Sequence, residues 1–220
     1  MDTEGDVSPR LPLTKDRILH AAVDLADREG LGALTMRRLG AELGVEAMSL
    51  YKHVTNKEGI LDGVVEVVIG EIEVPRNETD WKQAMRLRAV SARQVLSRHS
   101  WAIGLLENRG AMGPTVMRYV NAILGSLRSA GFSVEDAAHA FWLLDSYVYG
   151  HVIHEASVSS RSDEASVLEE TSMEGYPHLV EIATDAARSG YSVDREFEFG
   201  LELILEALDG RREPRGDGVG

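Results

Sequence analysis

The sequence predicts an all-α protein, with an N-terminal helix-turn-helix domain followed by a C-terminal helical domain. Three observations favour this fold class. Apolar residues recur at helical spacing along most of the 220 residues. Near the start, short segments of this kind are bounded by threonines that can cap helices and by glycines that can end them. Neither the alternating pattern of a half-buried strand nor an internal repeat of about 20 to 50 residues is visible.

The N-terminal domain is expected over residues 13–72, after a polar, acidic arm at residues 1–12 that favours disorder. Its first helix begins after Thr14, a good N-cap, and ends at Gly30. Apolar residues at helical spacing between these two positions form one stripe, as expected of a helix that packs against a core.

The next three helices of this domain are short. Thr35 caps the second helix, and Gly44 supplies the left-handed residue that ends it. The third is expected from Val45 to about Val54. The segment Thr55–Glu58 has the Thr-x-x-Glu form of a capping box, and it predicts the start of the fourth helix. Together these segments predict a helix-turn-helix.

The pattern breaks near Pro75, and a larger helical domain is expected over residues 80–210, followed by a polar tail at 211–220. The polar segment at 156–175 interrupts this domain, and residues 176–189 are expected to form a turn or a short helix. The main helices of the domain are expected over about 81–97, 101–107, 114–130, 134–155 and 193–209.

The composition excludes several classes of site. The chain has no cysteine, so disulfides, thiolate metal sites and a cysteine nucleophile are excluded. No apolar run approaches the roughly 18 residues that a membrane helix needs, and residues 1–15 lack the apolar core of a signal peptide. We therefore expect a cytoplasmic protein that does not bind a membrane.

The charge is unevenly distributed. A net charge of −13 argues against a general nucleic-acid binder. However, residues 10–60 hold eight Lys and Arg against seven Asp and Glu, whereas residues 61–220 hold fifteen against twenty-six. Residues 35–57 contain four basic residues and two acidic ones. A modest basic bias therefore coincides with the helix-turn-helix.

The third helix of this motif has two kinds of position. Leu50 and Val54 are four residues apart and are expected to face the core with Val45. In DNA-binding units, the second helix of the motif offers side chains to base edges in the major groove. A simple helical corner is an equal alternative on geometry alone. The positions left for contacts are Ala47, Met48, Ser49, Tyr51, Lys52 and His53.

Residues 14–61 closely resemble the DNA-binding domain of tetracycline-repressor (TetR) family regulators, above all in the Leu, Gly, Val, Tyr, His and Asn-Lys positions of "LGVEAMSLYKHVTNK". The stretches "SAGFSVEDA" (129–137) and "EFEFGLELILEAL" (196–208) resemble the C-terminal domain of the tetracycline-repressor branch. The resemblance implies a repressor that binds a palindromic double-stranded operator as a homodimer and is released by a small-molecule effector.

The resemblance also implies roles for single residues. Arg37 reaches a base edge from the second helix, and groove contacts come from Ala47, Met48, Ser49, Tyr51 and His53. Phosphate contacts come from Thr35, Tyr51, His53 and Lys57, and Lys52 is a further candidate donor. Where the tetracycline repressors carry Gln, Pro and Trp, this chain has Ala47, Met48 and Lys52, so a different operator is expected.

An effector cavity is expected between the C-terminal helices. Trp142, Asp145 and Tyr149 share one helical face, although an aromatic stripe of this kind is more often core than ligand contact. Asn121 and Asp145 are the polar groups that could orient a ligand or select a cationic one. The full set of candidate lining residues is Trp101, Leu105, Met117, Asn121, Trp142, Asp145 and Tyr149.

No metal and no cofactor are expected. The tetracycline-repressor branch holds its drug as a metal chelate through a His before a helix-opening Pro, but "LLENRGAMGP" (105–114) contains no His. Metal-chelated tetracycline is therefore not the expected effector. His151 and His154 share a helical face and could hold a metal, but the spacing fixes no third ligand.

The last helix is expected to build the dimer with the helix near 134–155, because its apolar stripe is long for one small domain to cover. The alternative is that the stripe closes the core of a single chain. Two other classes of function stay open, a helical enzyme and a protein-binding adaptor, although no phosphate loop or nucleophile elbow is present. The stripe consists of Phe197, Leu201, Ile204, Leu205 and Leu208.

Overall fold

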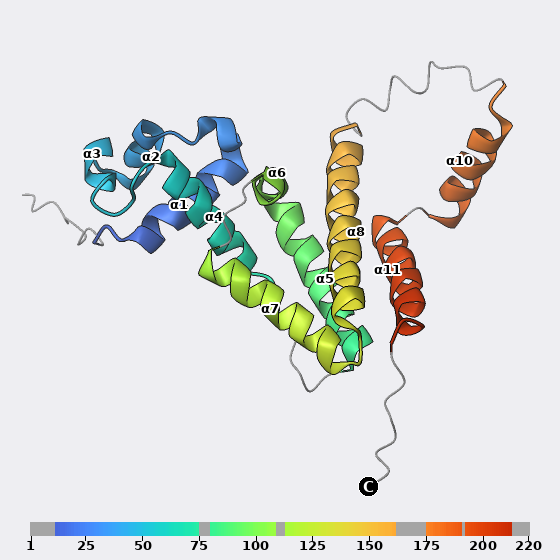
Figure 1. Cartoon of the computed structure of the whole chain (residues 1–220). Coiled ribbons are helices and arrows are strands. Elements are labelled where there is room, and N and C mark those ends of the chain that lie inside the picture. Colours follow the sequence, from blue (N-terminus) through green and yellow to red (C-terminus); the bar gives the residue numbers. More distant parts are fainter. Residues whose placement is uncertain (1–11, 75–79, 109–112, 162–174, 191, 213–220) are drawn as a thin grey trace, which may run out of the picture. The chain divides into compact units, whose positions relative to one another are not determined.

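The computed structural model describes residues 12–74, 80–108, 113–161, 175–190 and 192–212 (Figure 1). These residues form α-helices and one short 3₁₀ turn, with no strand among them, which confirms the predicted fold class. Within the same ranges, no helix is long and apolar enough to cross a membrane. The contacts divide the chain into two compact units, residues 1–70 with 101–116 and residues 71–100 with 117–220.

The first unit contains the N-terminal helices. The Thr14 hydroxyl accepts a hydrogen bond from the backbone N–H of Arg17 (3.2 Å), and Gly30 ends the first helix with a φ of 78°, as the sequence predicts. Its elements are α1 (Lys15–Glu29), the 3₁₀ turn η1 (Leu31–Ala33), α2 (Met36–Leu43), α3 (Ala47–Leu50), α4 (Lys57–Gly70) and α6 (Trp101–Asn108).

Close contact between α1 and α4 forms the core of this unit. A Cβ atom added at Gly63 of α4 would lie 2.4 Å from Leu19 Cδ2 of α1, so any larger residue would force the buried Leu19 side chain to move. Ile18, Leu25 and Val64 are fully buried in the same core. The apolar stripe predicted for the first helix is therefore the face that packs.

The second unit contains the longer helices. The side chain of Asp80 caps α5, and that of Ser192 caps α11, through hydrogen bonds from the backbone N–H three residues on. α5 packs along α8, and α11 packs on α8 (Figure 1). The elements are α5 (Trp81–Arg98), α7 (Pro114–Ser129), α8 (Val134–Arg161), α10 (Pro177–Ser189) and α11 (Val193–Asp209), with the first three residues of α7 in the first unit.

Three local expectations need correction. α3 is helical only over Ala47–Leu50, because Tyr51–His53 form turns after it. The cap of α4 is Asn56 rather than Thr55, since the Asn56 side chain accepts from the backbone N–H of Gly59 (2.9 Å). α8 continues to Arg161, six residues past its expected end.

The helix content of the C-terminal segments differs from the expectation. Residues 177–189 form a helix of 13 residues, α10, where a turn or a short helix was expected. The remainder of the polar segment, residues 162–174, lies outside the described residues, as do residues 1–11 of the expected arm and residues 213–220 of the tail.

Candidate nucleic-acid interface and regulatory core

The turn between α2 and α3 is tightly built. Gly44 has φ 67° and ψ 32°, the left-handed conformation that the sequence predicts for the end of α2. The backbone N–H of Val45 donates to the carbonyl oxygen of Gly40 (2.9 Å). A Cβ at Gly40 would lie 2.9 Å from the Val45 oxygen and 3.1 Å from the Ala47 nitrogen. The missing side chain at Gly40 therefore lets α3 sit directly on α2.

This turn presents the tip of α3 to solvent. Leu50 and Val54 are buried, as predicted, and they anchor the segment in the core of the unit. Met48 is 72% exposed and Tyr51 is 47% exposed, large fractions for apolar and aromatic side chains. Lys52 and His53 are also exposed, whereas Ala47 and Ser49 are half-buried. An apolar core thus holds a short exposed tip of aromatic and basic groups.

Two neighbouring arginines of α2 have different surroundings. Arg38 donates to Glu29 of α1 (Nη2 to Oε1, 2.5 Å) and lies 4.0 Å from Glu42, so it links the first two helices. These hydrogen bonds raise the pKa of Arg38 and lower the pKa of Glu29. Arg37 is exposed and has no side-chain partner in the part of the chain that the structure describes. Of these two arginines, Arg37 is therefore the one whose N–H groups are available to bind a ligand.

Two further candidates for phosphate contact flank this tip. The Thr35 hydroxyl accepts from the backbone N–H of Arg38 (3.1 Å), which leaves its own O–H able to donate outward. Lys57 is exposed at the first position of α4. A helix N-terminus favours anions, so a Lys there adds to an electrostatically suitable place for a phosphate.

The start of α7 is held by α4. The Glu66 carboxylate accepts from the backbone N–H groups of Thr115 (2.6 Å) and Val116 (3.2 Å), and so caps α7. The indole N–H of Trp101, in α6, donates to Asp27 of α1 (2.7 Å). α7 thus begins in the unit that contains α2 and α3 and continues into the other unit.

A buried polar cluster lies inside the second unit. Arg88 of α5 is 1% exposed, and its Nε donates to the hydroxyl of Tyr119 in α7 (2.6 Å). Its Nη2 donates to Oδ1 of Asp145 in α8. Burial alone would lower the pKa of Arg88, but Tyr119 and Asp145 outweigh it and raise that pKa. Burial, opposed by Arg88, raises the pKa of Tyr119 to about 12, so the phenol stays neutral.

The sequence identified only one member of this cluster, Asp145. Arg88 falls on the buried face of α5, one turn after Ala84 and one turn before Ala92. An arginine within an apolar stripe was the available signal, because a buried arginine needs a partner. Its partners could not be read from the sequence, since they come from two other helices.

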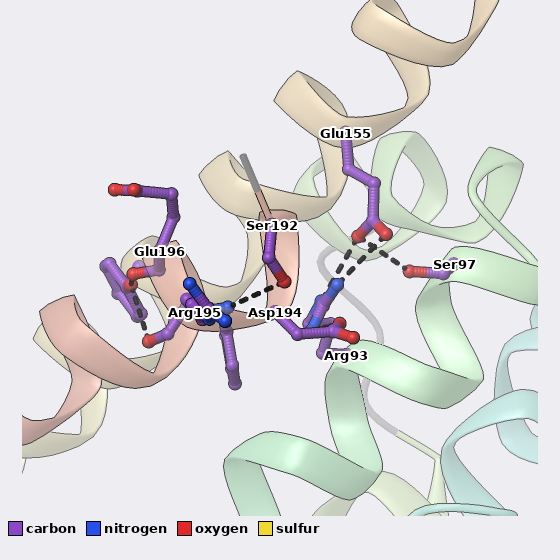
Figure 2. A network of polar contacts seen from close by, with 9 residues as sticks. Arg93, Ser97, Glu155, Ser192, Asp194, Arg195 and Glu196 are labelled. Atoms are coloured by element: carbon purple, nitrogen blue, oxygen red, sulfur yellow. Dashed lines mark hydrogen bonds and ion pairs between the residues drawn. The ribbon is translucent and has the colours of Figure 1, made fainter. Parts of the chain in front are cut away.

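A second polar network joins three helices of this unit (Figure 2). Arg93 of α5 makes a two-pronged contact with Glu155 of α8 (3.0 and 3.1 Å), and its Nη1 lies 2.8 Å from Asp194 of α11. Its guanidinium also lies over the Phe197 ring, 5.0 Å from the ring centre. These contacts clamp the start of α11 onto α5 and α8.

The two histidines of α8 lie in different surroundings. His151 is packed against the rings of Phe197 and Tyr147, and its buried Nε2 has no hydrogen-bond partner among the described residues. Burial and the nearby Arg93 lower its pKa. His154 is exposed. In the described ranges, no group of three or more His, Cys, Asp or Glu side chains is placed to hold a metal.

The expected effector residues differ in exposure. Asp145 alone of the seven is buried, and it is bound by Arg88. Trp142 is 66% exposed, Met117 is half-exposed and Asn121 is exposed. The other three, Trp101, Leu105 and Tyr149, are partly buried. Their contact with an effector stays a prediction.

The apolar stripe of α11 faces inward. Four of its five residues are buried in the unit, and Ile204 is partly buried, because α11 packs this face on α8. The stripe therefore closes the core of a single chain, the alternative that the sequence left open. Two other apolar residues of α11, Phe199 (65%) and Leu203 (52%), are exposed instead. The buried four are Phe197, Leu201, Leu205 and Leu208.

Comparison with known proteins agrees with this architecture. The sequence profile described as "Bacterial regulatory proteins, tetR family" matches residues 18–64, and the one described as "Tetracyclin repressor-like, C-terminal domain" matches residues 74–211. The chain belongs to the tetR family. The first profile covers α1 to α3 and the start of α4, and the second covers the buried Arg88 cluster.

Relatives within the tetR family cover nearly the whole chain. The HTH-type transcriptional repressor DrrR1 of Streptomyces coeruleorubidus is 30% identical over 91% of this chain and 79% of its own length. The class A tetracycline repressor from Escherichia coli is 32% identical over 91% of this chain and 92% of its own. The crystal structure of ActR from Streptomyces coelicolor, in complex with actinorhodin, has 33% identity and a TM-score of 0.74, covering 92% of this chain and all of that one.

The names of the two curated relatives describe repressors, and that of DrrR1 describes a transcriptional repressor. This tetR-family chain is accordingly a ligand-responsive transcriptional repressor of the same kind.

Proposed function

We propose that this tetR-family protein acts in the cytoplasm, binds a palindromic operator as a homodimer and leaves it when a small molecule binds the second unit. It is a regulator and not an enzyme. The observation that carries the DNA half of this proposal is the α3 tip. There Met48, Tyr51, Lys52 and His53 are exposed, although Leu50 anchors the same short helix in the core.

The residues of the interface divide by chemistry. Lys57, Thr35, Tyr51 and His53 present N–H or O–H donors, which suit phosphate oxygens and fix the position of the protein on the duplex. Arg37 offers a planar fork that matches the O6 and N7 acceptors of guanine.

The base-reading surface of α3 itself is mainly apolar. Ala47 and Met48 can touch a thymine methyl group, and Met48 is exposed enough to reach one. Ser49 and Lys52 add donors beside them. Ala47, Met48 and Lys52 stand where the tetracycline repressors carry Gln, Pro and Trp, so the amide and indole donors of that tip are replaced by one ammonium group. This difference supports the expectation of a distinct operator.

The dimer is proposed to form through the outward faces of α8 and α11. Phe199 and Leu203 lie one helical turn apart on α11, and Trp142, Leu143 and Ile153 are exposed on α8. The two helices pack against each other within one unit, so their exposed apolar residues can contribute to one patch. Monomeric proteins rarely expose such residues together. The helices are those predicted from the sequence, but the residues are different.

Effector binding is proposed for the second unit because ActR, of similar fold, is seen in complex with actinorhodin. Linkage requires that an effector which weakens operator binding binds less tightly to the operator-bound protein, by the same factor. α7 offers a physical route, since Glu66 of α4 caps its start and Tyr119 joins it to Arg88.

The DNA half of the proposal is tested by gel shift with DNA from upstream of the protein's own gene and neighbouring genes. We expect sequence-selective binding that weakens steeply with salt. Binding that is equal on random DNA, or absent, would contradict the proposal. An adaptor or an enzyme would give that result.

The dimer is tested by sedimentation at micromolar concentration. Leu203→Glu with Phe199→Glu places charges in the proposed interface, and we expect a folded monomer that no longer binds the operator. Leu87→Glu, on a half-exposed apolar residue of α5, is the matched control and should stay a dimer. A monomeric wild-type protein, or a dimer that survives the double substitution, would refute this interface.

A further inference from the structure

The space beside Gly200, in the middle of α11, is filled by a side chain of another helix. A Cβ atom added at Gly200 would lie 2.8 Å from Cζ and 2.9 Å from Cε2 of Tyr147, which belongs to α8. Atoms at these distances overlap, so no side chain fits at position 200 while the Tyr147 ring is in place. Glycine is less stable than alanine in the interior of a helix. Its presence here is explained by the ring that it admits.

The Tyr147 ring is fixed against α11 by polar and aromatic contacts. Its hydroxyl donates to the backbone carbonyl oxygen of Phe197 (2.9 Å), and the carbonyl oxygen of Glu196 is 3.2 Å away. The ring also stacks on the Phe197 side chain, with ring centres 5.5 Å apart. Burial raises the pKa of Tyr147, so the hydroxyl keeps its proton and stays a donor at neutral pH. Tyr147 therefore binds the backbone of α11 as well as a side chain.

The ion pairs that also hold α11 restrain it less closely. Arg86 of α5 pairs with Glu198 (2.6 Å), and Arg93 of α5 pairs with Asp194 (2.8 Å; Figure 2). Both carboxylates are exposed, so water and salt screen the two pairs. Their side chains are also long and flexible, and they can follow a small rotation of the helix. A short, rigid ring that reaches the backbone cannot.

The rotation of α11 decides where its exposed apolar residues point. Phe199 and Leu203 each stand two residues after a buried residue of the stripe, Phe197 or Leu201. Two residues span about 200° of an α-helix, so the exposed pair lies on the side opposite to the buried pair. Gly200 lies on the flank between these two sides. A side chain there would rotate α11 or lift it from α8, and either movement would redirect Phe199 and Leu203.

We propose that Tyr147 and Gly200 are positioning residues for the dimer, because the ring seated against Gly200 fixes the rotation of α11 and directs Phe199 and Leu203 at a second copy of the chain. This inference rests on the proposed function, since it takes the dimer through α8 and α11 as given and names what sets its geometry. Operator binding depends on the same contact, because the recognition helices of a dimer must match two half-sites at a fixed spacing.

Single substitutions test the two residues. Gly200→Ala introduces the Cβ that overlaps the ring, and Tyr147→Leu removes the ring atoms that this Cβ would meet. We expect each to raise the dimer dissociation constant about tenfold or more, measured by sedimentation over a dilution series, and to weaken operator binding. Gly125→Ala in α7 is the matched control and should leave the dimer unchanged, since nothing lies within 4 Å of its added Cβ.

The double variant Gly200→Ala with Tyr147→Leu separates positioning from a general loss of stability. The alanine methyl group occupies space that the ring has left, so the double variant should dimerise more tightly than either single variant. Two unrelated destabilising changes would add instead. Circular dichroism and thermal unfolding check that each variant is folded. Tyr147→Phe keeps the ring and loses only its hydrogen bond to α11, so it stays informative if Gly200→Ala does not fold, and it should weaken the dimer by a smaller factor.

Three results would overturn the inference: a folded Gly200→Ala variant that dimerises like the wild type, a double variant that dimerises no more tightly than the single ones, or an unchanged dimer in Tyr147→Phe. A wild-type monomer, or a dimer that survives Phe199→Glu with Leu203→Glu, contradicts the proposed interface instead. A wild-type dimer that those two charges dissociate, but that Gly200→Ala leaves intact, contradicts this inference alone.

Discussion

Arg37 in α2 and Arg88 in α5 have opposite surroundings. Arg37 is exposed and has no protein partner within the described ranges, so water solvates its N–H groups until a ligand replaces it. Arg88 is buried, with Tyr119 and Asp145 as partners and Nη1 left over. The difference teaches where a substitution acts. Loss of the exposed arginine changes binding, while loss of the buried one also removes the charge that neutralises a carboxylate.

The largest effect is expected at the buried pair. Arg88→Met should lower the free energy of unfolding by about 3–5 kcal/mol, because Asp145 loses the cation that neutralises it. Arg88→Met combined with Asp145→Leu should recover much of this loss, since no lone charge remains. Urea unfolding followed by circular dichroism measures both. A double variant less stable than the single one would show that the pair stabilises the fold beyond charge compensation.

A substitution at Gly40 should affect the α2–α3 region and leave the second unit, which contains Arg88, unchanged. Gly40→Ala places a methyl group 2.9 Å from the Val45 oxygen, so α3 must shift on α2. We expect a loss of about 1–3 kcal/mol in stability and a large loss of operator binding, with the second unit unchanged.

Gly32→Ala is the matched control for this substitution. It has the same change in size, but nothing lies within 4 Å of the added Cβ. Gel shift and thermal unfolding compare the two variants. If both bind the operator like the wild type, the close contact between α2 and α3 is not needed to place the tip.

The contrast between exposed and buried sites also explains what the sequence could predict. Caps are local, so Thr14, Thr35 and Gly44 were identified correctly from neighbours in the chain. The exposure of Met48 was accessible to the same reasoning, because it follows from helical spacing around Leu50. Tyr51, Lys52 and His53 are also exposed, but they lie in turns after the helix. Asn56 was missed because two adjacent residues, Thr55 and Asn56, both suit a cap, and only the structure shows which one bonds Gly59.

Long-range pairing was not predictable in this way. Tyr119 and Asp145 lie 31 and 57 residues from Arg88 in the sequence, and nothing local indicates that the three meet. The stripe of α11 shows a related limit. Its periodicity predicted an apolar face correctly, but periodicity cannot tell whether that face meets α8 of the same chain or a second chain.

The effects of an exposed arginine that is free and one that is paired can also be compared within one helix, at Arg37 and Arg38 of α2. Arg37→Ala should reduce discrimination at one base pair of each half-site by about 1–3 kcal/mol, if its fork reads a guanine. Arg38→Ala breaks an exposed pair with Glu29, and it should leave sequence preference unchanged. Competition binding with operators that carry single base changes distinguishes the two. Equal losses on operator and random DNA for Arg37→Ala would reduce Arg37 to a phosphate contact.

The smallest effect is expected from Lys57, which is exposed and is proposed to contact only phosphate. Lys57→Ala should weaken binding to all sequences about equally and reduce the slope of log affinity against log salt by about 0.9 for each phosphate that the lysine neutralises. Lys82→Ala removes the same charge from the second unit, where Lys82 pairs with Asp209 (3.1 Å), and should leave the slope unchanged. Fluorescence anisotropy across a salt series measures both slopes. A slope that falls equally in the two variants would mean that net charge, rather than a contact at the start of α4, sets the salt dependence. The exposed basic residues would then act through their summed charge. Of the residues compared, only the buried Arg88 would have an effect that depends on where it lies.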